Sequence, residues 1–467
     1  MPHLLPDEPI RTLDEYLATD TGGLGLQRAT QLGPDATIDE VLRSGLRGRG
    51  GGGFPTGRKW AGVRTAVGTR HYVVANAGEG EPGTFKDRAL LRANPYQFVE
   101  GLVIAAYAVG ADEAFIGLKA SFEAEVEAIE RAIVEMQQAG ICRDCQVTIA
   151  RGPEEYLLGE ETALLEVIEG KEPLPRNVAP YVYGLFATAP QIGWESKGSD
   201  VNRADPERSN PTAVNNVETL SNVPHILARG ADWFRSMGTE ASPGTQVCTV
   251  VGDVRRAGVA EFEMGTPLSE VIVGISGGTN AGRRLKAVFS GVANTVITAE
   301  HIDVGLSYED FAAIGSGLGS AGFIVLDDSA CMVEAARVFS RFLYVESCGQ
   351  CPACKRGTNE ITRLLDLLEE GRATTGDFGE IGGWLKSVTD ANRCYLPVEE
   401  QLLISSMLRE FAEEFTEHVE TGRCPRPRRL MTPKLVDIVD GRAIYDEAQE
   451  RKRPDWTYEP EPEPTAR

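Results

Sequence analysis

The chain has 467 residues, of which 42% are hydrophobic and 25% charged, a balance typical of a globular protein large enough for several cores. Its 69 acidic and 47 basic residues give a formal charge of −22, and such a surface repels nucleic acid and anionic lipid. We therefore expect no nucleic-acid partner and no direct membrane insertion. The start of the chain, MPHLLPDEP, lacks the basic and apolar regions of a signal peptide, so a cytoplasmic location is expected by default.

The N-terminal part of the chain divides into an extension and one helix. Residues 1–35 show no regular pattern and are expected to form an irregular N-terminal extension. Residues 37–40, Thr-Ile-Asp-Glu, are a capping box that predicts a helix ending at Gly45. A glycine-rich loop follows at once.

From residue 71 the pattern alternates between strand and helix. Strands are expected at 72–77, 114–118 and 147–150, with one helix opened by Asn94 and Pro95 and a second over 121–136. This order predicts parallel strands in an α/β layer. Ligands of such layers bind outside the carboxyl ends of the strands, so the loop that follows the first strand is expected at a binding edge.

After residue 186, three successive segments differ in composition and in hydrophobic pattern. A polar, turn-rich stretch at 187–209 is interpreted as a surface insertion. Residues 245–328 contain four β-type runs around one short helix, which predicts a small α+β module. Residues 329–421 have a helical pattern, and the extreme end of the following tail is expected to be disordered.

Three of the nine cysteines, Cys348, Cys351 and Cys354, stand at three-residue intervals. Such clustering suits metal ligation in a reducing compartment better than disulfides. Cys394 is the best candidate for a fourth ligand, and Cys424 is a weaker one. Four such thiolates usually hold a [4Fe-4S] cluster. Zinc is the alternative, although four-cysteine zinc sites more often use two separated pairs.

The other cysteines carry weaker signals. Cys142 and Cys145 have no second pair and no active-site context, so we interpret them as an incidental surface pair rather than a redox site. Cys248 and Cys331 lie in apolar runs and are expected in the core.

The glycine-rich loop contains Gly48, Gly50 and Gly53 in the GxGxxG spacing. A helix precedes it rather than a strand, so an ordinary Rossmann fingerprint is rejected. Bare backbone can still approach a phosphate or a flat ring closely, and the helix that follows offers unpaired N–H groups. Arg49 and Lys59 add positive charge. A flexible surface loop is the alternative, but the embedded aromatic and proline residues favour a shaped binding loop.

Two acidic pairs flank these expected sites, Glu79 with Glu81 and Glu160 with Glu161. Carboxylates accept hydrogen bonds from ribose hydroxyls and repel a 2′-phosphate, which favours NADH over NADPH. The alternative for the second pair is stabilisation of a helix N-terminus.

Five motifs coincide in one order: GLRGRGGGGFPTGRKW, NAGEGEPGTFKDR, YLLGEETALLE, PTAVNNVETL and ESCGQCPACKRG. Together they resemble the flavin-binding NADH dehydrogenase subunit of respiratory complex I, the 51-kDa or F subunit. That family includes the diaphorase subunits of NAD-linked hydrogenases and formate dehydrogenases. The resemblance covers roughly residues 42–424.

The resemblance implies a domain organisation. An FMN- and NADH-binding α/β domain would span 36–240, a ubiquitin-like β-grasp ligand-binding module 245–328, and a helical [4Fe-4S] domain 329–424. The N-terminal extension would precede them, and a C-terminal tail at 425–467 would follow.

The resemblance also implies site residues. The cofactor-binding set would be Gly48, Arg49, Gly50, Gly51, Gly53, Phe54, Lys59, Asn76, Glu79, Tyr156, Gly159, Glu160, Val214, Asn215, Asn216 and Thr219. Glu81 and Glu161 would lie near the ribose or nicotinamide of NADH as catalytic residues. The cluster ligands would be Cys348, Cys351, Cys354 and Cys394. Gly78 and Gly80 depart from the family, which usually has aspartate and serine there, so two polar contacts to the cofactors would be missing.

The function implied is NADH dehydrogenase activity, in which FMN takes hydride from NADH and electrons pass singly to a [4Fe-4S] cluster. The partner would be an electron-accepting iron-sulfur subunit, either thioredoxin-like with a [2Fe-2S] cluster or of the complex I type. Such partners would place the protein peripherally on the inner face of the membrane. Two alternatives stay open: a diaphorase subunit of a formate dehydrogenase or hydrogenase, and a non-catalytic electron-wiring protein that has lost NADH turnover.

Overall fold

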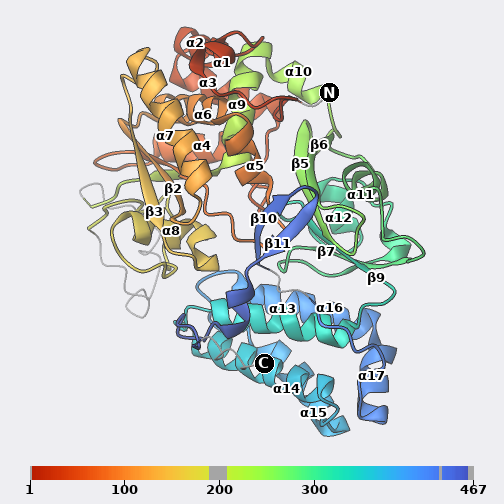
Figure 1. Cartoon of the computed structure of the whole chain (residues 1–467). Coiled ribbons are helices and arrows are strands. Elements are labelled where there is room, and N and C mark those ends of the chain that lie inside the picture. The colour runs from red at the N-terminus through yellow and green to blue at the C-terminus, as the bar shows by residue number, and fades with distance from the viewer. Residues whose placement is uncertain (1–2, 189–207, 431–433, 461–467) are drawn as a thin grey trace.

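The computed structural model describes residues 3–188, 208–430 and 434–460. Figure 1 shows three units: an α/β unit at the N-terminal end, a second sheet beside it, and a helical bundle below both. The predicted insertion at 187–209 lies almost entirely outside the described residues, as does the extreme end of the tail.

The first sheet is wholly parallel, with strand order β3-β2-β1-β4. Its strands are β1 (Tyr72–Asn76), β2 (Glu113–Lys119), β3 (Gln146–Gly152) and β4 (Thr212–Asn216). The helices of this unit after the glycine-rich loop are α4 (Thr56–Thr65), α5 (Lys86–Ala93), α6 (Pro95–Val109), α7 (Glu123–Gln138), α8 (Glu161–Ile168), α9 (Val217–Arg229) and α10 (Ala231–Arg235). The predicted α/β layer is confirmed, and α6 begins where expected, with the Asn94 side chain accepting from the backbone of Gln97.

β4 has no counterpart in the sequence interpretation, which assigned the PTAVNNVETL segment only to a binding site. It is parallel to β1, pairing Tyr72 with Thr212 and Asn76 with Asn216. β1 therefore lies between β2 and β4, and the chain runs outward from it in both directions. Such a reversal of strand order leaves a crevice at the carboxyl ends of the two strands.

The expectation of an irregular N-terminus is wrong. Two helices precede the predicted one: α1 (Leu13–Leu17) and α2 (Leu24–Leu32). Thr12 and Glu15 form a capping box at α1. The predicted helix is α3 (Pro34–Ser44), but the capping box expected at 37–40 is wrong, because Gly33 is the N-cap and Pro34 opens the helix. Thr37 lies inside α3, where its hydroxyl donates to the carbonyl of Gly33. The extension is anchored by buried contacts, because Tyr16 donates a 2.5 Å hydrogen bond to the buried carboxylate of Glu100 on α6.

The second unit is a mixed five-stranded sheet in the order β6-β5-β9-β7-β8. Its elements are β5 (Thr245–Gly252), β6 (Gly258–Glu263), α11 (Leu268–Ser276), β7 (Leu285–Ser290), β8 (Ile297–Thr298), a 3-10 turn (Ala299–His301), α12 (Tyr308–Ala313) and β9 (Gly322–Asp327). β5 and β9 pair in parallel, and the other pairs are antiparallel. The four expected strands and the helix are present; the two-residue β8 and the short α12 were not anticipated.

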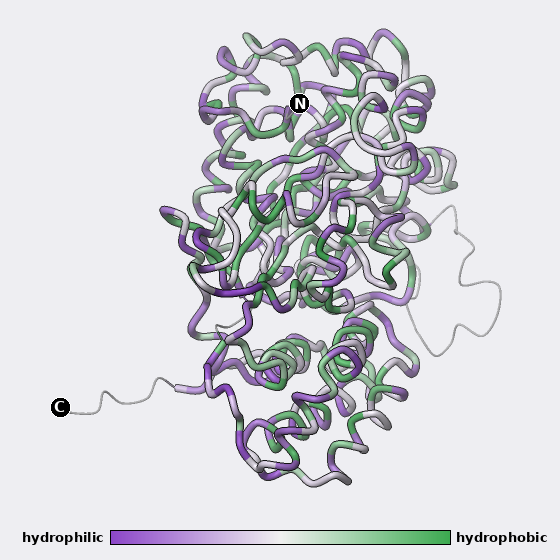
Figure 2. Tube along the Cα trace, turned by 90° about the vertical axis from the view of Figure 1, so that its right-hand side faces the viewer, coloured by the Kyte–Doolittle hydropathy of each residue, from purple (hydrophilic) through white to green (hydrophobic). Residues whose placement is uncertain are grey.

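The third unit is a bundle of five helices. They are α13 (Met332–Glu346), α14 (Pro352–Glu369), α15 (Thr375–Ser387), α16 (Leu396–Glu410) and α17 (Ala412–Thr421). The bundle shares one hydrophobic core with a face of the second sheet, where the rings of Phe289 and Phe339 lie 4.9 Å apart. Figure 2 shows this bundle from the side, as a lower mass with apolar residues gathered between its helices.

The tail contains a hairpin that the sequence interpretation missed, β10 (Leu435–Val439) and β11 (Arg442–Tyr445), followed by a 3-10 turn (Glu447–Arg451). An Asp-Gly pair between alternating apolar residues is its signal. The hairpin lies where the three units meet (Figure 1), and the backbone N–H of Ala257 donates to the carbonyl of Gly441. Within the described ranges, no helix combines the length and apolar composition needed to cross a membrane.

Candidate functional site

A cavity of about 700 Å³ opens where the three units meet, and we call it the central cleft. Its walls are the glycine-rich loop, the carboxyl ends of β1 and β4, the 3-10 turn Tyr156–Gly159, two loops of the second sheet and the start of α16. The crevice expected from the strand order is therefore present, and its volume is in the range of small-molecule and cofactor sites.

The central cleft collects most of the residues named from the sequence. Those lining it are Gly48, Gly50, Gly51, Gly53, Phe54, Lys59, Asn76, Glu79, Glu81, Tyr156, Gly159, Glu160, Glu161, Val214, Asn215, Asn216 and Thr219. Arg49 is not among them. Its side chain is buried and donates to the carbonyl of Pro243, 3.0 Å away, so its guanidinium holds the loop against the segment that leads into β5.

The glycine-rich loop is a rigid turn rather than a flexible linker. The N–H of Gly48 donates to the carbonyl of Phe54 at 2.9 Å, and the Tyr308 hydroxyl donates to the carbonyl of Gly48 at 2.8 Å. Gly53 has φ +59°, and a Cβ there would lie 2.6 Å from the Tyr308 ring, whereas a Cβ on Gly52 would meet nothing. The bare face of the loop therefore points into open space at the start of α4, where unpaired N–H groups and the helix dipole favour an anion.

Lys59, on the first turns of α4, supplies positive charge in the cleft. Its Nζ lies 2.5 Å from Oε1 of Glu161 and 2.9 Å from the carbonyl of Val214. Glu161 is about half exposed. This pair thus leaves one carboxylate oxygen of Glu161 available to a ligand hydroxyl.

The other predicted glutamates are held more tightly. Glu160 caps α8, accepting from the backbone of Thr162 and Ala163, which is the role the helix-start alternative gives it. Glu79 is buried and accepts from Nε of Arg88 at 2.9 Å and from the backbone of Asp87. Its carboxylate therefore shapes the floor of the cleft.

Glu81 belongs to a buried group of acids around Tyr156. The Tyr156 hydroxyl donates to Glu81 at 2.5 Å and approaches Glu399 at 3.2 Å, and Glu81 also accepts from the backbone of Val292. Burial raises the pKa of Glu81, while burial and then the nearby Glu81 carboxylate raise that of Glu399 well above its usual range.

The asparagines at the strand ends are fixed by the scaffold. Nδ2 of Asn76 donates to the carbonyl of Gly159 at 2.7 Å, and Oδ1 of Asn215 accepts from the Trp60 indole at 2.8 Å. Asn216 caps α9 and donates to Asp87. These contacts hold the edges of β1 and β4 rigid against the cleft.

Gly78 and Gly80, which replace the aspartate and serine usual in the family, also line the cleft. A Cβ on Gly80 would come 3.1 Å from Nζ of Lys119, the flexible end of a side chain, and one on Gly78 would come 3.2 Å from Leu158. A Cβ would therefore be tight at both positions, and at Gly78 the backbone oxygen of Leu158, 3.3 Å away, adds to the crowding.

The four predicted cluster cysteines gather beside the cleft. Cys351 is the N-cap of α14, and Cys348 and Cys354 stand three residues before and after it, so the three thiols lie around the start of that helix. Burial raises the pKa of Cys354 to about 11. Burial, and to a smaller extent the nearby Cys348, raises the pKa of Cys394. Cys394 also lines the central cleft. One of the four predicted cluster ligands thus forms part of the cavity wall.

Residues from the second and third units were missed as cleft residues. They are Ala293, Asn294, Gly319, Ser320, Tyr395, Leu396 and Glu399, together with Gly52, Thr84, Asp87 and Leu157 of the first unit. No local motif marks those from the other units, because they reach the cleft only through tertiary packing.

The structure differs from the expectations for the Cys142–Cys145 pair and for Cys331. Cys142 and Cys145 are buried in the core of the first unit, not on the surface, because the turn between α7 and β3 folds inward. Burial raises the pKa of Cys142 to about 11. Cys248 is buried as expected. Cys331 is also buried, but its sulfur contacts the polar side chains of Glu369 and His418.

Two family models match the chain. Residues 41–225 match the Nuo51 FMN-binding domain, and residues 334–418 match the iron-sulfur binding region of NADH-ubiquinone oxidoreductase F. The first match contains the glycine-rich loop and both strand ends of the cleft, and the second contains all four predicted cluster cysteines.

Individual proteins extend the likeness to most of the chain. In Rhizobium meliloti, the F 2 subunit of NADH-quinone oxidoreductase is 39% identical, over 84% of this chain and 90% of the relative. The HndC subunit of the NADP-reducing hydrogenase of Solidesulfovibrio fructosivorans is 34% identical, over 92% and 84%. A crystal structure of an NAD⁺-reducing [NiFe]-hydrogenase in the H₂-reduced state matches with a TM-score of 0.74 and 31% identity, over 91% of this chain and 66% of the hydrogenase chain.

Proposed function

This chain belongs to the family of NADH-quinone oxidoreductase F subunits, and on that premise we propose that its central cleft oxidises NADH through FMN and passes the electrons singly to a [4Fe-4S] cluster. One observation carries the proposal. The cavity lined by the glycine-rich loop is also lined by Cys394, so a flavin in the cleft and a cluster on the cysteines would share one wall.

The residues of the cleft fit the phosphate and ring of FMN. The bare backbone from Gly50 to Gly53, the start of α4 and the Lys59 ammonium would hold the phosphate. The fixed asparagines Asn76, Asn215 and Asn216 would border the ring. When bound, FMN supplies the conversion between a two-electron hydride donor and a one-electron acceptor.

NADH would enter along the exposed side of the cleft. Phe54 is 54% exposed at the mouth of the loop and would stack against a flat ring, and Glu161 would accept from ribose hydroxyls. Glu81, buried beside Tyr156, would hold the inner end and exclude water. Because acidic groups surround this path, a 2′-phosphate would be disfavoured.

The thiols fit a [4Fe-4S] cluster better than a single ion. The four ligands would be Cys348, Cys351, Cys354 and Cys394, three of them around the N-terminus of α14. Four thiolates of which three stand at three-residue intervals are the usual ligands of a cubane.

We propose the following domains: 1–35, 36–240, 245–328, 329–424 and 425–467. The first sheet and the helical bundle support two of them. The second sheet supports a ubiquitin-like β-grasp module at 245–328, since α11 packs against β5 and β6. The N-terminal extension packs onto the first domain, and the tail forms a hairpin between units.

The acceptor would be an iron-sulfur subunit of a larger complex, with the protein cytoplasmic and peripheral to the membrane through its partners. Relatives are named as subunits of NADH-quinone oxidoreductase and of a hydrogenase. A diaphorase subunit of a hydrogenase is a second candidate, favoured by the 91% coverage of this chain by a hydrogenase structure.

The proposal is tested by adding NADH and NADPH to the purified holoprotein without oxygen, while recording flavin absorbance and the EPR spectrum. We expect NADH to bleach the flavin and reduce the cluster, and NADPH to act far more weakly. Cys348→Ala should lose the cluster signal but keep flavin bleaching, whereas Cys145→Ala, a buried thiol of the first unit, should keep both. A flavin that NADH leaves oxidised would contradict the proposal and favour an electron-wiring protein.

A further inference from the structure

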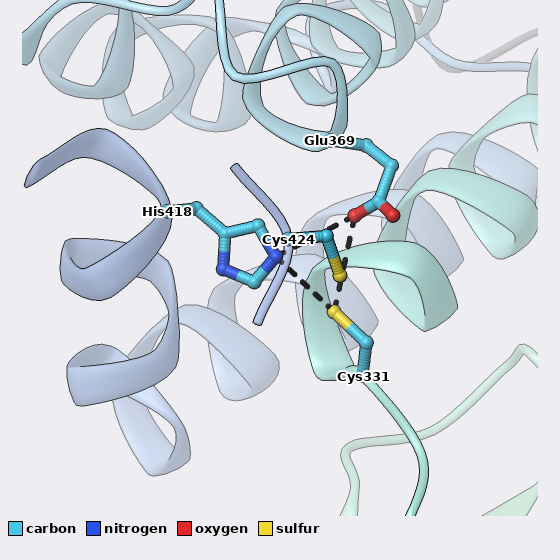
Figure 3. Close-up of side chains that lie close together, drawn as sticks. All are labelled: Cys331, Glu369, His418 and Cys424. Carbon is cyan, nitrogen blue, oxygen red and sulfur yellow. Dashed lines mark hydrogen bonds and ion pairs between the residues drawn. The ribbon is translucent and has the colours of Figure 1, made fainter. Parts of the chain in front are cut away.

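A second group of metal-binding side chains lies in the helical bundle, apart from the four predicted cluster ligands. It consists of Cys331, Glu369, His418 and Cys424, and one ligand atom of each lies within 4.8 Å of all the others. In Figure 3 the two sulfurs face each other, with the imidazole on one side and the carboxylate on the other. We propose that these four side chains bind one structural zinc ion.

The distances fit tetrahedral coordination. Sγ of Cys331 lies 3.3 Å from Nε2 of His418 and 3.8 Å from Oε2 of Glu369, and those last two atoms are 3.6 Å apart. Ligands about 2.0–2.3 Å from a tetrahedral zinc are separated from one another by about 3.4–3.8 Å. The three atoms therefore need to move little to receive the ion.

The histidine presents the correct nitrogen. Nδ1 of His418 lies 2.7 Å from the carbonyl of Glu414, to which it donates, so the lone pair of Nε2 points at Cys331 and Glu369. A backbone acceptor on the outer nitrogen is the usual way in which proteins orient a metal-binding imidazole.

The cysteines are also suitably placed. Cys331 is fully buried and is the N-cap of α13, where its sulfur accepts from the backbone N–H of Glu334 at 3.4 Å. Cys424 was considered as a substitute ligand for the predicted cluster. In the structure its thiol instead interacts with Cys331 and Glu369.

The backbone brings these residues together from four segments. Cys331 begins α13, Glu369 ends α14, His418 lies on α17 and Cys424 follows α17. The turns after α14 and α17 touch so closely that a Cβ on Gly371, at φ +67°, would lie 2.0 Å from the carbonyl oxygen of Gly422. Two sulfurs, an imidazole and a carboxylate are all ligands that zinc accepts, and Cys331 and His418 are buried. The ion would tie the segment after α17 to the helical bundle.

The test measures metals in the holoprotein by mass spectrometry after exchange into metal-free buffer. We expect about one zinc per chain in addition to the iron. Cys424→Ser and His418→Gln should lower the zinc content roughly tenfold or more, with iron, FMN and NADH-ferricyanide activity retained. The double variant Cys142→Ala/Cys145→Ala, which removes two buried thiols elsewhere, should keep its zinc.

Two further measurements do not depend on how well the variants fold. Zinc X-ray absorption of the wild-type protein should show two sulfur and two nitrogen or oxygen ligands. Removing zinc with a chelator should expose the segment after α17 to trypsin, which cuts after Arg423 and Arg428. A wild-type protein without stoichiometric zinc, one holding iron at this site, or one with a Cys331–Cys424 disulfide would overturn the proposal.

Discussion

Glu400 shows at the scale of one residue how burial makes a carboxyl group sensitive to pH. It lies inside the helical bundle, accepts a 2.6 Å hydrogen bond from Ser340, and its Oε2 has no partner in the described part of the chain. Burial raises its pKa to about 8. At neutral pH the folded protein therefore holds this group as the neutral acid.

This gives a prediction for Glu400→Gln. An unfolded glutamate titrates near pH 4.3, so between about pH 4 and 8 the folded chain holds a proton that the unfolded chain has lost. Wild-type stability should therefore fall as pH rises through that window, by up to about 1.4 kcal/mol per unit from this group. The apparent Tm of Glu400→Gln should rise relative to wild type between pH 6 and pH 8.

The control is Glu413→Gln, a change at an exposed position on α17. It should follow the wild-type pH profile. If Glu400→Gln followed that profile as well, Glu400 would have to be ionised in the folded protein, and the argument from its burial would fail.

At the scale of elements, the glycine-rich loop depends on one left-handed residue. Gly53→Ala would introduce a Cβ at φ +59° and 2.6 Å from Tyr308, whose hydroxyl fixes Gly48. We expect a lower apparent Tm, with a backbone cost of roughly 1 kcal/mol plus the clash, and a reduced FMN content. Flavin absorbance per chain and thermal unfolding measure the two effects.

Gly62→Ala is the matched control for Gly53→Ala. Gly62 is an exposed glycine inside α4, and a Cβ there would meet nothing. The same substitution should therefore stabilise the protein, by about 0.5–1 kcal/mol, and leave FMN content unchanged. Equal effects at both positions would contradict a strained loop.

The elements also show how far local sequence patterns predict this fold. Asn94 and Pro95 mark the start of α6, and the apolar runs of β1, β2 and β3 are long enough to recognise. β4 was missed because its five residues end in two asparagines, which strands disfavour. α1 was missed although Thr12 and Glu15 form a capping box at its start, since its five residues are too few to show a period.

The same limit applies to the sites. The cleft residues of the first unit stand in recognisable motifs, so most were named from the sequence. Glu399 was not, because only packing brings α16 to the Tyr156 hydroxyl. Cys331 and His418 are 87 residues apart, and their neighbours have no metal-binding spacing. Contacts of this kind are set by tertiary structure, which a single sequence does not display.

At the scale of the whole molecule, a buried ion pair connects the C-terminal tail to the turn that borders the cleft. Nζ of Lys452 lies 2.9 Å from both oxygens of Glu346, and both side chains are fully buried. Glu346 also accepts from the backbone N–H of Tyr156, whose hydroxyl contacts Glu81. Burial alone would favour the neutral acid, but the ammonium of Lys452 lowers the pKa of Glu346.

Lys452→Met should therefore affect both stability and the cleft. It leaves a buried carboxylate unpaired, which costs about 3–5 kcal/mol, and it loosens the turn that carries Tyr156. We expect a marked drop in apparent Tm and a higher KM for NADH. Arg453→Met, one residue further and half exposed, should change neither. Adding Glu346→Gln to Lys452→Met removes the stranded charge and should recover much of the lost stability. If Lys452→Met behaved like Arg453→Met, the tail would not be coupled to the cleft through this ion pair.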